Sequence, residues 1–132
     1  MAQANLKNES QEIITGNDNI VIVDVFQSIR GGRTLEVSGF KPDVIKAGHI
    51  IIQETATKEY KPMPVNSDDT AYDELPEGHI YVGILIQSLL KKRPMAGIMV
   101  RGTVNPAVAP YNMDTILSAV KTALPLIDFR ED

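Results

Sequence analysis

Apolar and polar residues follow one another along this chain in short runs that predict a protein built mainly of β-strands. The first run, IVIVDVF at residues 20–26, is apolar except for Asp24 and contains neither glycine nor proline. Thr34–Phe40 alternates, with Leu35 and Val37 on one face, as a half-buried strand does. Between them lies Arg30-Gly31-Gly32-Arg33, which favours a turn. We therefore expect residues 20–40 to form a β-hairpin.

The second half of the chain contains further strand patterns. Ile50–Glu54 and Glu59–Lys61 read as the two arms of a hairpin, and Pro62 and Pro64 indicate a sheet edge, because proline cannot donate to a β-ladder. Ile80–Gln87 is apolar on both faces, which is typical of a strand between two layers or at an interface. This chain is too small, on this interpretation, to bury both faces by itself.

The C-terminal quarter predicts one more strand, a helix and a terminal strand. Ile98–Val104 alternates, with Arg101 and Thr103 expected to point outward. Asn112–Leu124 has apolar residues at helical spacing and ends before Pro125, and Ile127–Arg130 follows as a last strand. The predicted fold is mainly β: a small β-barrel-like domain with one short C-terminal helix.

Length and composition predict one domain preceded by an arm. The chain has 132 residues, enough for a single modest core. Residues 1–19 are polar, with Leu6, Ile13 and Ile14 as the only large apolar side chains besides Met1. We predict an extended N-terminal arm over residues 1–19 and a single β-rich domain over residues 20–132, of which residues 20–40 are an additional hairpin.

Charge and residue usage exclude several function classes. The net charge of −4 does not favour a nucleic-acid-binding protein, which would present a basic face. The absence of cysteine removes disulfides, thiolate nucleophiles and cysteine metal sites. The chain begins without a basic, apolar signal sequence, and no apolar run is long enough to span a bilayer. We expect a protein made and used without secretion, with no membrane partner.

The residues that could act in catalysis or bind a metal do not form a familiar catalytic motif. His49 and His79 each follow a glycine, and a zinc site needs three or four ligands, so a role at the start of a strand is favoured for both. The acidic loop 66–78 lacks the calcium-loop pattern. Lys91-Lys92-Arg93 is a basic tip that either contacts an acidic surface or is solvated. We expect no enzyme activity, no cofactor and no metal.

Four segments carry a resemblance to a known family. They are AGHIIIQETATKEYKPM (47–63), HIYVGILIQ (79–87), GIMVRGTVNPAVAP (97–110) and LPLIDFRED (124–132), with Gly83 and Gly102 inside apolar runs. Over residues 45–132 the chain resembles the head decoration proteins of tailed phages, the lambda protein D type. The resemblance implies a β-clip-like trimer that binds the outer surface of the major capsid shell and stabilises it. It also implies a virion location, with the host cytoplasm as the place of assembly.

The resemblance also suggests which residues make contacts. In that family the N-terminal arm becomes ordered on the capsid and adds a strand to the major capsid protein. Carried to this chain, the capsid-contact residues are expected to be Ile13, Ile14, Ile20 and Ile22. The trimer interface is expected to involve Ile80, Tyr81, Val82 and Leu85. The hairpin expected over residues 20–40 departs from the compact family pattern and leaves open which segment makes the main capsid contact.

Two alternatives belong to other classes. A trimeric base or adaptor for a phage head fibre is one, although this chain has no length for a receptor-binding domain. A β-clip nucleotide hydrolase is the other. Such an enzyme needs a Ser-Gly phosphate loop and an aspartate-bearing strand motif, and Ser38-Gly39-Phe40 supplies only the first.

Overall fold

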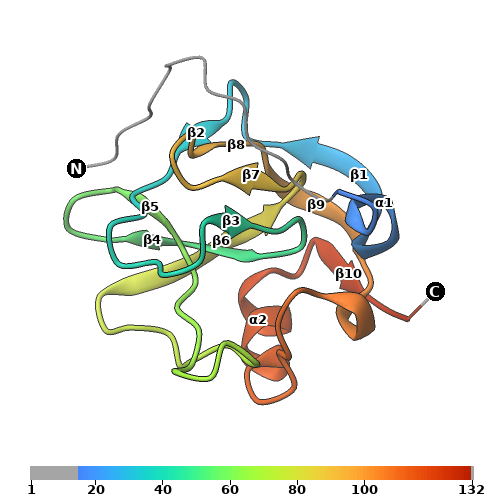
Figure 1. Ribbon diagram of the computed structural model, residues 1–132. Helices are drawn as coiled ribbons and strands as arrows, with labels where there is room; N and C mark the ends of the chain where they lie inside the picture. The colour runs from blue at the N-terminus through green and yellow to red at the C-terminus, as the bar shows by residue number, and fades with distance from the viewer. Residues whose placement is uncertain (1–14, 132) are drawn as a thin grey trace.

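The computed structural model describes residues 15–131, and these form a mainly β fold around one central sheet (Figure 1). The predicted fold class is therefore confirmed, although the sheet does not close into a barrel. The central sheet has six strands in the order β1-β9-β6-β4-β5, and β10 pairs with β9 off this path. The strands are β1 (Ile22–Ser28), β4 (Ile50–Glu54), β5 (Tyr60–Pro62), β6 (His79–Leu85), β9 (Ile98–Val104) and β10 (Ile127–Phe129).

Smaller elements flank the central sheet. Two short ladders join β2 (Arg33–Thr34) to β8 (Met95–Ala96) and β3 (Val44–Ile45) to β7 (Leu89–Leu90). The helical elements are α1 (Asp18–Val21), a 3-10 turn η1 (Pro106–Val108) and α2 (Leu117–Ala123). Figure 1 shows α2 and β10 at one end of the molecule, and β2, β7 and β8 at the other.

Two hydrophobic cores lie on the two faces of the central sheet, and the period of two along each strand separates them. Ile50, Ile52 and Ile84 belong to the larger core, which also receives the apolar face of α2. Ile51 and Leu85 belong to the smaller core. Both faces of β4 and of the end of β6, at Ile84 and Leu85, are therefore covered within one chain. The expectation that the chain alone leaves β6 partly uncovered holds only for the first part of the strand, where Ile80 is exposed.

The predicted hairpin over residues 20–40 is wrong. β1 pairs along its length with β9 in antiparallel register, for example Val25 opposite Gly102. Gly31 and Gly32 have positive φ angles of 79° and 68°, and the chain turns there into β2, which pairs with β8 instead. The apolar pattern located β1 correctly, but the choice of partner depends on contacts distant in sequence that local turn chemistry does not encode.

Gly83 and Gly102 are required where neighbouring strands approach closely. A Cβ on Gly102 would collide with the carbonyl oxygen of Asp24 in β1 and with Sδ of Met99. A Cβ on Gly83 would collide with the carbonyl oxygen of Met99 and lie 2.8 Å from Cγ2 of Ile98. Two strands pair with β9 on one side: β6 pairs at Ile98 and Met99, and β10 pairs from Gly102 to Val104. The two glycines mark the points where β9 is most crowded.

The other predicted elements are largely confirmed. β4 and β5 form the expected hairpin, and β5 with Pro62 lies at the edge of the sheet. The terminal strand is present as β10, parallel to β9. Arg101 is exposed as predicted, but Thr103 is only 5% exposed, because β1 and β10 flank β9 at this position.

The C-terminal helix is shorter than predicted. α2 begins at Leu117, five residues after Asn112, where the helix was expected to start. The side chain of Asn112 instead accepts a hydrogen bond of 2.8 Å from the backbone N–H of Asp114, which favours a turn over helix. The backbone of Asn112 also pairs with Ala71, so it is committed to the loop 66–78.

The expected boundary at residue 19 lies too far along the chain. Residues 17–21 form a turn and α1, and Val21 is buried against the domain. The Asp18 carboxylate accepts hydrogen bonds from the N–H and the hydroxyl of Ser88, at 2.8 Å and 2.7 Å. The folded domain therefore begins before residue 19.

Candidate protein-binding surface

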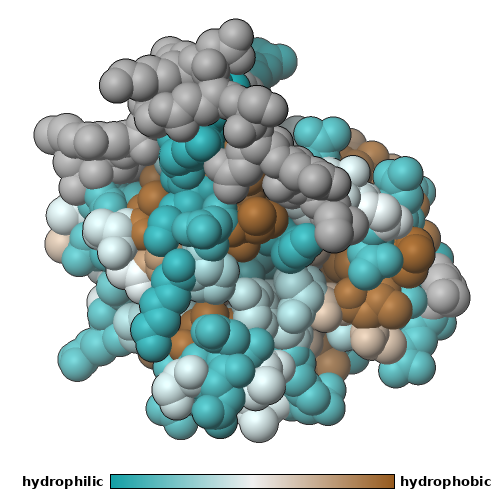
Figure 2. Space-filling model, viewed as in Figure 1, coloured by the Kyte–Doolittle hydropathy of each residue, from teal (hydrophilic) through white to brown (hydrophobic). Residues whose placement is uncertain are grey.

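The most unusual surface is β1, which lies at one edge of the central sheet. Within the described residues β1 pairs only with β9, so its other edge is open. After Ile22 every side chain of the strand is exposed, including Val23 at 40%, Val25 at 39% and Phe26 at 70%. A bare apolar edge strand is an aggregation hazard unless something binds it. Figure 2 shows apolar residues at the surface on the right of the view, the side where β1 and β10 lie in Figure 1.

A surface groove of about 480 Å³ runs beside β1. Its walls come from α1, β1 and the segment that follows β6. The lining residues are Thr15, Asp18, Asn19, Ile22, Val23, Asp24, Val25, Ile86, Gln87 and Ser88. The lining contains two carboxylates and neither lysine nor arginine. The groove thus combines aliphatic side chains with polar and acidic ones.

The four residues expected to contact a capsid fall into three groups. Ile13 and Ile14 lie outside the described residues. Ile20 is 51% exposed on α1, close in sequence to the open edge. Ile22 is a correction: it is only 9% exposed and packs in the larger core, because it lies at the start of β1 directly after the buried Val21 and opposite the buried Val104. Val23, Val25 and Phe26 present the exposed apolar surface instead. Asp24, the one charge in the run, was the sequence signal that this strand is not buried.

The four residues expected at a trimer interface also differ in how far their side chains are exposed. Ile80 is 48% exposed at the start of β6, and Tyr81 and Val82 are half-buried. Leu85 is a correction: it is fully buried in the smaller core, so it is not accessible to another chain. The surface available from β6 is therefore its first part.

His49 directly precedes β4, as expected of a residue at the start of a strand, and its side chain lies in the core. It is fully buried, with its ring in edge contact with the rings of Phe40, Tyr72 and Tyr111 at centroid distances of 5.2–5.5 Å. Nε2 donates a 2.9 Å hydrogen bond to the carbonyl oxygen of Met63, and Nδ1 has no hydrogen-bond partner among the described residues. Burial lowers the pKa of His49 to about 4, so the ring is neutral at pH 7.

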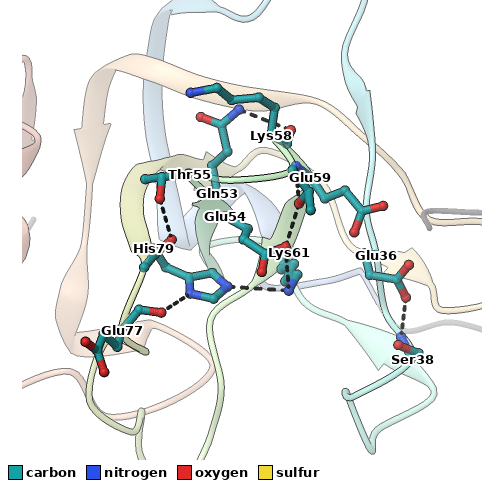
Figure 3. A network of polar contacts seen from close by, with 12 residues as sticks. Glu36, Ser38, Gln53, Glu54, Thr55, Lys58, Glu59, Lys61, Glu77 and His79 are labelled. Atoms are coloured by element: carbon teal, nitrogen blue, oxygen red, sulfur yellow. Dashed lines mark hydrogen bonds and ion pairs between the residues drawn. The ribbon is translucent and has the colours of Figure 1, made fainter.

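His79 takes part in a surface network on the β4–β5 hairpin (Figure 3). Its Nδ1 lies 2.9 Å from the carbonyl oxygen of Glu77, and its Nε2 lies 3.4 Å from Nζ of Lys61. Lys61 also lies 3.6 Å from the Glu54 carboxylate, which accepts a hydrogen bond from the hydroxyl of Thr57. The hydrogen bond from Thr57 lowers the pKa of Glu54, with a smaller contribution from Lys61. The network fixes the hairpin against the start of β6.

Ser38-Gly39-Phe40 lines a pocket of about 300 Å³ together with Lys61 and His79. The backbone N–H of Ser38 donates to the Glu36 carboxylate at 3.0 Å, and the same acidic side chain lines the pocket. An anion placed here would meet this carboxylate, and the Ser38 N–H is already used. The geometry gives the nucleotide-hydrolase alternative no phosphate-binding loop.

The basic tip, a metal site and a membrane span are the candidates that remain. Nζ of Lys91 donates hydrogen bonds to the carbonyl oxygens of Phe40 and Lys41, which ties the basic tip to the 40–43 loop. Among residues 15–131, no three histidine, aspartate or glutamate side chains come close enough to hold a metal ion. No helix in that range has the length and apolar character to cross a membrane.

Comparisons of the chain with models of protein families, with curated proteins and with solved structures found no match.

Proposed function

We propose that this protein is a capsid decoration protein that binds the outer surface of a major capsid shell as a homotrimer and stabilises it. The observation that carries the proposal is β1, an edge strand with an open ladder and exposed valine and phenylalanine side chains on it. Such an edge favours a protein whose work is to bind another protein.

Further support comes from the chemistry around that surface. The polar contacts of His49 and of the Lys61 network join segments of the fold to one another, His49 to Met63 and Lys61 to Glu54 and His79. The resemblance of residues 45–132 to the lambda protein D type supplies the particular partner. A trimer would engage several shell subunits at once, so weak single contacts would combine through effective concentration.

The test is reconstitution on expanded capsids that lack this protein, taken from the phage that encodes it. We expect the purified protein to co-sediment with these capsids and to occupy three-fold positions in a reconstruction. Capsids with the protein bound should release their DNA at a higher temperature than bare capsids. Absence of co-sedimentation over a wide range of protein concentration would refute the proposal, and single isolated copies on the shell would refute the trimer.

A further inference from the structure

The groove beside β1 has a charge pattern that selects a partner. Asp24 is the only charged residue of β1, and its exposed carboxylate forms no ion pair or hydrogen bond with another described residue. Asp18, the other carboxylate of the lining, is occupied by Ser88. The valines on either side of Asp24 are exposed by about two fifths of their surface.

We propose that the open edge of β1 binds an extended segment of the partner protein that carries a lysine or arginine opposite Asp24, flanked by apolar side chains. This inference rests on the proposed function and names the chemistry of its partner. An added strand would pair its main chain with the open ladder of β1. Its alternate side chains would cover Val23 and Val25, and its cation would complement a groove that has two carboxylates and no cation.

A second copy of this chain fits the edge less well than such a segment. Two β1 strands paired edge to edge would bring a second Asp24 into a groove that already contains Asp18 and Asp24. Like charges on facing strands destabilise the pairing. The acidic edge thus disfavours self-association and favours a cationic strand.

The direct test uses two short capped peptides of alternating threonine and valine, one with a central arginine and one with a central glutamate. Each is titrated into the full-length protein and into its Asp24→Lys variant while backbone amide shifts are recorded. We expect the arginine peptide to perturb residues 22–28 of the wild type and to bind roughly fivefold or more tightly than the glutamate peptide. Asp24→Lys should reverse this preference. Equal affinities in all four combinations, or shifts that avoid residues 22–28, would overturn the inference.

Capsid binding separates this inference from the proposed function. Val25→Lys should lower occupancy on capsids at least about tenfold, because an edge lysine blocks strand addition. The matched control is Leu126→Lys, which changes a residue 61% exposed next to β10. Val23→Lys serves as the second edge variant if Val25→Lys unfolds the protein. Full occupancy by Val23→Lys and Asp24→Lys would overturn the inference and leave the function standing. Peptide binding at β1 without any capsid binding would overturn the function alone.

Discussion

Asp18 and Ser88 are joined by two hydrogen bonds although they lie 70 residues apart. The Ser88 hydroxyl in turn accepts a 2.9 Å hydrogen bond from the backbone N–H of Ala47. The Asp18 carboxylate thereby connects the start of the folded domain to two loops of the central region. It also fixes one wall of the groove beside β1.

Removing this connection should loosen the entrance to β1. We expect Asp18→Ala to lower the free energy of unfolding by about 1.5–3 kcal/mol, because two hydrogen bonds to a charged group are lost. Urea denaturation measures the change. Asp114→Ala, at an exposed carboxylate in a turn, is the control and should stay within about 0.5 kcal/mol of the wild type. Equal stabilities for the two variants would contradict the anchoring role.

Gly102 should tolerate no side chain. We expect Gly102→Ala to destabilise the protein by about 2 kcal/mol or more, since its methyl group would overlap the backbone of Asp24 and the Met99 side chain. Gly97→Ala is the matched control on the neighbouring segment, where the closest atom would lie 3.6 Å from the added carbon. Thermal denaturation of both variants compares them. A control variant as unstable as Gly102→Ala would show that crowding is not the cause.

Acid should destabilise the fold through His49. The pKa of His49 is about 4 in the folded protein and near 6.5 in an unfolded chain. A lowered folded pKa means that its contribution is complete above pH 6.5 and is lost as the pH falls towards 4. The loss amounts to on the order of 3 kcal/mol.

The pH dependence can be assigned with substitutions. The groups facing the His49 ring are the phenols of Tyr72 and Tyr111, whose pKa values burial raises, so neither ionises in this window. We expect His49→Gln to be less stable at pH 7 but to show a flatter stability profile between pH 7 and 5. His79→Gln should keep the wild-type slope. Urea midpoints across this range measure it, and parallel profiles for wild type and His49→Gln would disprove the assignment.

The trimer proposal can be tested at the start of β6. Ile80→Glu should weaken self-association at least about tenfold without unfolding, because the residue is 48% exposed on the protomer. Leu126→Glu, at a similarly exposed leucine, should leave the trimer intact. Light scattering over a concentration series gives the oligomeric state. A trimer unaffected by Ile80→Glu would place the interface elsewhere.

Deletion of residues 1–14 tests the arm while retaining Asp18. The truncated protein should remain folded, because the described core begins at Val21, and should bind capsids at least about tenfold more weakly. Occupancy in a co-sedimentation assay measures the effect. Unchanged occupancy would show that residues 1–14 do not contribute to the contact and that β1 and its groove suffice.

The sequence predicted elements better than it predicted their partners. The apolar runs located β1, β4, β6 and β9, since period-two burial is written into the side chains. The pairing of β1 with β9 was missed, because glycines at a turn suggested a local hairpin while the true ladder joins segments that lie far apart in the sequence. The contact between Asp18 and Ser88 was missed because it too joins residues that lie far apart in the sequence. His49 was expected at the start of a strand and lies there, but its burial was not predicted, because a histidine between a glycine and isoleucines has no pattern that distinguishes a surface position from a core one.

The position of β9 in the sequence determines when β1 can pair during synthesis of the protein. Strand β1 ends at Ser28, but its only described partner begins at Ile98 and is itself flanked by β10, which ends at Phe129. On the ribosome the apolar strand β1 therefore remains unpaired until the chain has been made as far as β9. Nascent chains must be shielded during this interval, because long-range strand pairing is slow and exposed edges associate with one another. Slow synthesis of the segment between β1 and β9 would lengthen this interval and favour association of newly made chains.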